Sequence, residues 1–183
     1  MMVGMLLSPA ASPAVAERIG VDSFFFVKRH AVYLIPTLVV LIAVSFLNPT
    51  QARRLCALVL VGSLLLMVAT LLIGLEVKGS RRWLNLAGFS VQPSEFLKPA
   101  FVVICAWLFA ENAKRPDVPG HLFAVILLAM VVVLLVAQPD LGQTILVVTA
   151  WGCLLFMAGL SWRWILAMGG AGVAGLVSAY LFF

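Results

Sequence analysis

Long apolar stretches alternate with short polar ones along most of this chain. A bilayer core about 30 Å thick needs about 20 apolar residues in a helix that rises about 1.5 Å per residue. Stretches near this length lie at residues 31–47, 55–75, 93–110, 121–138 and 139–160, and a sixth lies at 164–183. The pattern predicts an all-α fold, a polytopic bundle of transmembrane helices.

The polar connections between these stretches are short. They read NPTQARR, EVKGSRRWLNLAGFSVQ, ENAKRPDVPGH and SWRW, which leaves no room for a soluble domain between spans. Residues 1–17 are apolar but too short to span a membrane, and no basic region precedes them, so we interpret them as part of a truncated first span rather than as a signal peptide. We predict one integral membrane domain over residues 1–183, with about six or seven spans.

The composition supports a lipid environment and narrows the function. Charged residues make up 10% of the chain, whereas soluble domains carry about 25%. The formal net charge is +5, which in a membrane protein indicates contact with anionic head groups or an anionic ligand rather than with nucleic acid. The three cysteines and two histidines show no metal-ligand spacing, and no phosphate-binding loop or hydrolase motif is present.

The motif VQPSEFLKPAF places charge at the start of the stretch 93–110. Pro93 fits the first position of a helix, and Glu95 fits its first turn beside the positive end of the helix dipole. Lys98 follows on the same face, so the two charges can pair just inside the membrane boundary, while Pro99 leaves the Glu95 carbonyl without its N–H donor. Ionisable residues at such a depth usually mark a functional site. The alternative is that Glu95 and Lys98 only satisfy each other and fix helix packing.

A second helix start, AQPDLGQT, repeats this arrangement. Gln138, Pro139 and Asp140 stand where the first motif has Gln92, Pro93, Ser94 and Glu95. Two spans separate the two starts, so both should open on the same side of the membrane, where Asp140 joins Glu95, Lys98, Arg81 and Arg82. Gly142 would let another backbone approach closely. The alternative for Asp140 is an ordinary cap at a helix end.

The segments VKGSRRWLNLAGFSVQPSEFLKPAFVV and QPDLGQT resemble the signature regions of the SEDS proteins, the FtsW/RodA family of bacterial cell-wall polymerases. The likeness covers essentially the whole chain, and EVKGSRRWL, SEFLKPAF and FMAGLSWRW are more similar to the FtsW, or cell-division, branch. The resemblance implies a peptidoglycan glycosyltransferase that polymerises lipid II, the undecaprenyl diphosphate-linked disaccharide-pentapeptide. It implies a multi-pass protein of the bacterial inner membrane, at the division septum, with the cation-rich face outside.

The resemblance also implies a ligand site and partners. Arg81 and Arg82 would hold the diphosphate, and the whole set expected to line the substrate cavity is Arg81, Arg82, Trp83, Gln92, Ser94, Glu95, Lys98 and Asp140. The expected partners are a class B penicillin-binding transpeptidase, other membrane proteins of the division complex and membrane lipid, with no nucleic acid. No cofactor and no metal ligand is identified, although a divalent cation could assist the diphosphate.

The family's proposed general base is an aspartate in an outer loop, which the resemblance places beyond residue 183. We therefore expect the chain to be the N-terminal part of a longer protein and inactive by itself. Two alternatives stay open. A polar cavity between helices would also serve a transporter that flips lipid II, and the small-residue stripe GGAGVAGLVSA at 169–179 could serve a non-catalytic scaffold of the division complex.

Overall fold

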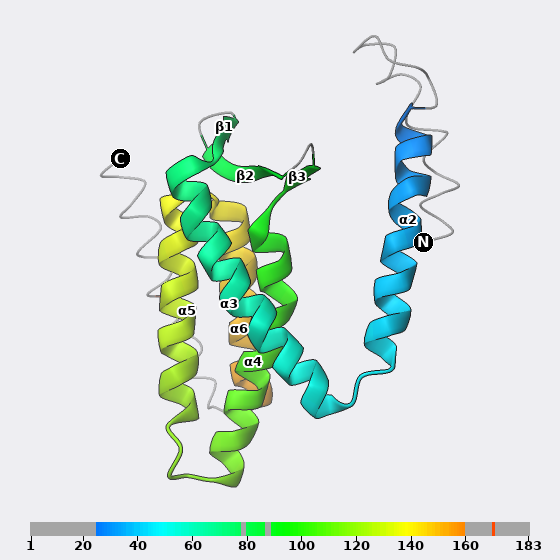
Figure 1. Ribbon diagram of the computed structural model, residues 1–183. Helices are drawn as coiled ribbons and strands as arrows, with labels where there is room; N and C mark the ends of the chain where they lie inside the picture. Colours follow the sequence, from blue (N-terminus) through cyan, green and yellow to red (C-terminus); the bar gives the residue numbers. More distant parts are fainter. Residues whose placement is uncertain (1–24, 78–79, 87–88, 160–169, 171–183) are drawn as a thin grey trace. The chain divides into compact units, whose positions relative to one another are not determined.

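The computed structural model describes residues 25–77, 80–86, 89–159 and Gly170 (Figure 1). The chain divides into two compact units, Met1–Ala52 and Arg53–Phe183. The predicted first span, and the sixth stretch apart from Gly170, lie outside the described residues. The single integral membrane domain therefore stays a prediction.

Each of the five predicted spans from 31–47 to 139–160 coincides with a helix. The helices are α2 (Phe25–Ser45), α3 (Pro49–Ile73), α4 (Pro93–Lys114), α5 (Gly120–Ala137) and α6 (Leu141–Met157). By length and composition, α3, α4 and α5 can cross a membrane, whereas α6 and the apolar part of α2, His30–Ser45, are shorter. The helical transmembrane bundle predicted from the sequence is confirmed over this part of the chain.

Helix α3 begins six residues before the predicted stretch because its start is capped. Pro49 occupies the first helical position, which needs no N–H donor. The backbone N–H of Asn48 donates to the side-chain Oε1 of Gln51 at 3.0 Å, one half of a capping box. The polar segment NPTQARR therefore forms the first turns of the helix rather than a loop.

The core of the second unit lies between α4, α5 and α6, with α3 contributing from one side (Figure 1). Residues Leu97, Phe101 and Cys105 recur every four positions along α4 and are buried. They belong to one cluster with residues of the other helices, Met67, Val131, Leu135, Val147 and Trp151. The outer helix faces expose large apolar side chains, among them Leu72 and Val133, as expected of helices surrounded by lipid.

A small antiparallel sheet occupies the connection between α3 and α4, for which the sequence pattern predicts only a polar loop. Its strands are β1 (Leu75–Val77), β2 (Ser80–Leu86) and β3 (Phe89–Val91), in the order β1–β2–β3. Leu84 of β2 is buried, and β2 contacts α4. The sheet thus fixes the position of β2 close to the start of α4.

The connection between α4 and α5 is tight, and Gly120 closes it. The backbone N–H of Gly120 donates to Asn112 Oδ1 at 3.1 Å. A Cβ at this position would overlap the backbone carbonyl of Leu108, so only glycine allows α5 to start so close to α4. The start of α4, the end of α5 and the start of α6 consequently lie at one end of the unit, beside the sheet (Figure 1).

Candidate functional site

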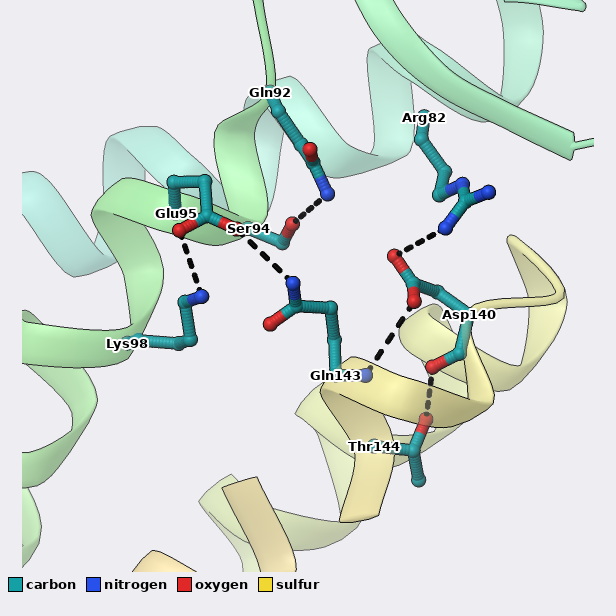
Figure 2. Close-up of polar contacts among 8 residues, drawn as sticks. All are labelled: Arg82, Gln92, Ser94, Glu95, Lys98, Asp140, Gln143 and Thr144. Carbon is teal, nitrogen blue, oxygen red and sulfur yellow. Dashed lines mark hydrogen bonds and ion pairs between the residues drawn. The ribbon is translucent and has the colours of Figure 1, made fainter. Parts of the chain in front are cut away.

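Three elements bring charged side chains together at this end of the unit (Figure 2). Arg82 comes from β2, Glu95 and Lys98 come from the first turns of α4, and Asp140 precedes α6. Two ion pairs result, one between α4 residues and one between the sheet and α6. The two cations and two carboxylates balance in formal charge.

Asp140 caps α6 and also carries one of the two ion pairs. Its Oδ1 accepts the backbone N–H of Gln143 at 3.4 Å, which satisfies one of the free donors at the helix start. Its Oδ2 lies 3.3 Å from Nη1 of Arg82, and the Asp140 side chain is only 5% exposed. A carboxylate buried this deeply is costly without a cation beside it. The capping role and the ion-pair role therefore exist together.

Glu95 and Lys98 form the second pair within the first turns of α4. Nζ of Lys98 lies 2.7 Å from Oε2 of Glu95, with the lysine side chain 20% exposed and the glutamate 49% exposed. Pro93 is the first residue of the helix and Pro99 lies inside it, as the motif predicts. The exposure of Glu95 means that this pair faces outward from the helix bundle.

Gln143 connects the two pairs, and sequence reasoning missed it. Its side-chain Nε2 donates to Oε1 of Glu95 at 3.0 Å, while its backbone N–H donates to Asp140. One residue therefore contacts both carboxylates, as Figure 2 shows. A signal was present, because Asp140 and Gln143 match the pattern of a capping box.

Gln138 is a second residue that was not predicted to belong to the site. Its side chain is almost fully buried, and its Nε2 donates to the Met67 carbonyl at 3.0 Å and to Thr70 Oγ1 at 2.7 Å. Both amide hydrogens are thus used on α3. This contact holds the α5–α6 turn, and with it Asp140, against α3.

The remaining predicted residues lie in the same region with weaker connections. Gln92 Nε2 donates to the buried Ser94 Oγ at 3.1 Å, and Trp83 lies in β2 with 37% of its surface exposed. Arg81 lies in β2 opposite Glu76, and its side chain is outside the described residues. Apart from the neighbouring backbone of α6 itself, no described atom lies within 4 Å of a Cβ built on Gly142, so the close approach predicted there is not found among these residues.

The arrangement suits an anionic ligand that meets cations at the edge of a membrane. Arg82 and Lys98 are both partly exposed, and an anion could compete with the carboxylates for them. Within the described ranges, no three His, Cys, Asp or Glu side chains come together as metal ligands would. The role of these residues in binding a ligand stays a prediction.

Fold and site together define a multi-pass membrane protein with a cluster of paired charges at the ends of its helices. Over residues 1–183 the chain matches the family of cell cycle proteins FtsW, RodA and SpoVE. It is 44% identical over 182 residues to the "Probable peptidoglycan glycosyltransferase FtsW" of Caulobacter vibrioides, an alignment that covers 99% of this chain and 47% of the relative. The protein of the same name from Escherichia coli O6:H1 is 32% identical over 177 residues, covering 96% of this chain and 43% of that one.

Solved structures agree with the sequence relatives. The rod shape determining protein RodA of Thermus thermophilus is 28% identical, with a TM-score of 0.70, covering 94% of this chain and 58% of RodA. A chain from the structure "Structural coordination of polymerization and crosslinking by a peptidoglycan synthase complex" gives 28% identity and a TM-score of 0.71, covering 98% of this chain and 54% of that one. The chain therefore belongs to the FtsW/RodA/SpoVE family, and it spans about half the length of the curated relatives it matches.

Proposed function

We propose that this chain is part of a peptidoglycan glycosyltransferase that polymerises lipid II during septal cell-wall synthesis. Family membership and the names of the relatives support the reaction. The observation that links the proposal to particular residues is the charged cluster. In it, Arg82 is paired with Asp140 and Lys98 with Glu95, close to the helix ends. Lipid II presents a diphosphate at the membrane surface, and a cluster at the ends of helices that can cross a membrane would meet it there.

In the proposed reaction, a hydroxyl of the acceptor sugar loses its proton and attacks the anomeric carbon of the donor. A new glycosidic bond forms, and the bond to undecaprenyl diphosphate breaks. Cationic side chains lower the barrier by stabilising the charge on the leaving diphosphate. Arg82 and Lys98 would serve this role, Asp140 and Glu95 would hold them in place, and a general base outside this cluster would take the proton.

A divalent cation is a secondary part of the proposal. It would arrive bound to the diphosphate and reduce its charge, because the described residues contain no cluster of ligands that would hold it alone. Polymerisation by the purified protein should then fall when a chelator is added and recover with Mg²⁺ or Mn²⁺. Full activity in excess chelator would remove the cation from the mechanism.

The proposed setting is the division septum of the bacterial inner membrane, with a class B penicillin-binding transpeptidase as partner. A chain of similar fold comes from a structure described as a peptidoglycan synthase complex that coordinates polymerisation and crosslinking. A glycan polymerase working beside a transpeptidase fits that description. Co-purification of the two proteins from membranes, and fluorescence of a tagged copy at the septum, would test the partner and the location.

The direct test is polymerisation of purified lipid II by the full-length gene product, alone and with the transpeptidase. We expect glycan strands that a muramidase degrades. A parallel assay in vesicles should measure transfer of labelled lipid II between leaflets. If lipid II moved between leaflets but no glycan formed, the protein would be a flippase rather than a polymerase. If a folded protein showed neither activity, only the role as a scaffold would remain.

A further inference from the structure

Two helices of this chain begin with the same local pattern but use it differently. At α3, Asn48 is followed three residues later by Gln51, whose side chain accepts the N–H of Asn48.

At α6, Asp140 is followed three residues later by Gln143. Here the N–H of Asp140 donates instead to the Leu135 carbonyl at 3.0 Å, and the Gln143 side chain reaches α4 to donate to Glu95. The side chain of Gln143 therefore does not cap α6, although its position favours that role.

The chemistry of the contact fixes the orientation of the Gln143 amide. A carboxylate accepts hydrogen bonds only, so the amide must turn its NH₂ group toward Glu95 and its oxygen away. Within the described part of the chain, that oxygen is buried and has no hydrogen-bond partner, and Figure 2 draws no contact to it. An unsatisfied buried acceptor costs stability. Gln143 thus donates to Glu95 while its own buried oxygen has no partner among the described residues.

We propose that Gln143 is a positioning residue of the candidate site, which joins the two ion pairs into one unit. Its side chain holds Glu95 in the orientation in which Oε2 meets Lys98, and its backbone N–H holds Asp140, whose other oxygen meets Arg82. The two cations that would face the diphosphate are thereby kept in a fixed relation, although one lies on a sheet and the other on α4. The ligand in this inference, a diphosphate, rests on the proposed function. The contacts that Gln143 makes do not depend on it.

The test uses lipid II polymerisation by the full-length gene product carrying Gln143→Leu, which keeps the approximate size of the side chain and removes the amide. We expect activity to fall roughly tenfold, because small errors in positioning are costly, with a melting temperature equal to or above that of the parent. The matched control is Gln51→Leu, which removes the glutamine that caps α3 and should leave activity within about twofold while lowering the melting temperature.

A second comparison separates positioning from general damage. If Gln143 acts through Glu95, the double variant Gln143→Leu/Glu95→Ala should be no less active than Glu95→Ala alone, within about twofold. Parent-like activity of Gln143→Leu, or a double variant reduced by the product of the two single effects, would overturn the proposal. If Gln143→Leu does not accumulate in membranes, Gln143→Asn, whose shorter side chain falls short of Glu95, takes its place under the same criteria.

The proposal can fail independently of the proposed function. If the parent protein makes no glycan, the function is wrong, but the link between Gln143 and Glu95 can still be measured by thermal unfolding of the parent, the two single variants and the double variant. Melting-temperature shifts that do not add would support the link. Strictly additive shifts would show that the two residues do not interact.

Discussion

At the scale of single residues, the site depends on how each charge is compensated. Asp140 is nearly buried and has Arg82 beside it, whereas Glu95 is half exposed and has both Lys98 and Gln143. A buried carboxylate depends more strongly on its partner than an exposed one. Glu95 can therefore be replaced with less harm to folding, which makes it the better residue for a functional test.

Glu95→Ala should lower lipid II polymerisation roughly a hundredfold, because Lys98 loses its partner and Gln143 its acceptor. The protein should still insert normally, since a lysine near a helix end can extend its ammonium group toward water. The matched control is Glu111→Ala at the other end of α4, where Glu111 pairs with the exposed Arg115 at 3.5 Å. Activity and membrane content of both variants are to be measured together. Parent-like activity of Glu95→Ala would remove Glu95 from the site.

At the scale of helices and strands, the bundle depends on a few close contacts. Gly120 allows α5 to start against α4, and Gln138 ties the α5–α6 turn to α3. Both contacts determine where α6 begins, and Asp140 lies at that point. The position of the charged cluster therefore follows from contacts that lie partly outside it.

Gly120→Ala should lower the free energy of unfolding by about 1–3 kcal/mol, because the added methyl group meets the backbone carbonyl of Leu108. Gly62→Ala in α3 is the control, since no described atom beyond the neighbouring backbone of α3 lies within 4 Å of a Cβ there. This variant should be neutral or stabilising by up to about 1 kcal/mol. Thermal unfolding in detergent compares the two. Equal melting temperatures would show that the α4–α5 contact is looser than the structure indicates.

The helices could be predicted from the sequence, and the links between them could not. Uninterrupted apolar runs identify the five helices, three of which are long and apolar enough to cross a membrane, because a membrane permits little else of that length. The sheet was missed because its strands are short and lie among charged residues. Gln143 was missed because its partner, Glu95, lies 48 residues away, and a local pattern does not reveal a distant acceptor. Counting the spans predicted that Asp140 and Arg82 lie on the same side of the membrane. Their ion pair could be seen only in the structure.

At the scale of the whole molecule, the alternation of helix directions places the sheet and the charged cluster at one end of the second unit and the α4–α5 connection at the other. In a membrane these two ends face opposite compartments. The family resemblance predicts that the charged cluster lies on the outside, where the proposed reaction would take place. The orientation is therefore a prediction with a direct consequence for accessibility.

Single cysteines at Ser90 in β3 and Asp117 between α4 and α5, both exposed, can test the orientation. The background would carry alanine in place of Cys56, Cys105 and Cys153. In intact cells with a permeabilised outer membrane, a membrane-impermeant maleimide should label the cysteine at 90 but not the one at 117, and lysed membranes should show both labelled. If only the cysteine at 117 were labelled in intact cells, the orientation would be the reverse of the predicted one. The charged cluster would then not lie on the outer face.

The short connection after α4 also has a use in engineering. Arg115, Pro116 and Asp117 are exposed, and they precede the Gly120 contact. Because loop tips with exposed polar residues accept added sequence readily, a fluorescent reporter or epitope inserted between Pro116 and Asp117 would lie at the opposite end of the second unit from Arg82 and Asp140 (Figure 1). Such a fusion would let the protein be followed in living cells while its chemistry is left alone.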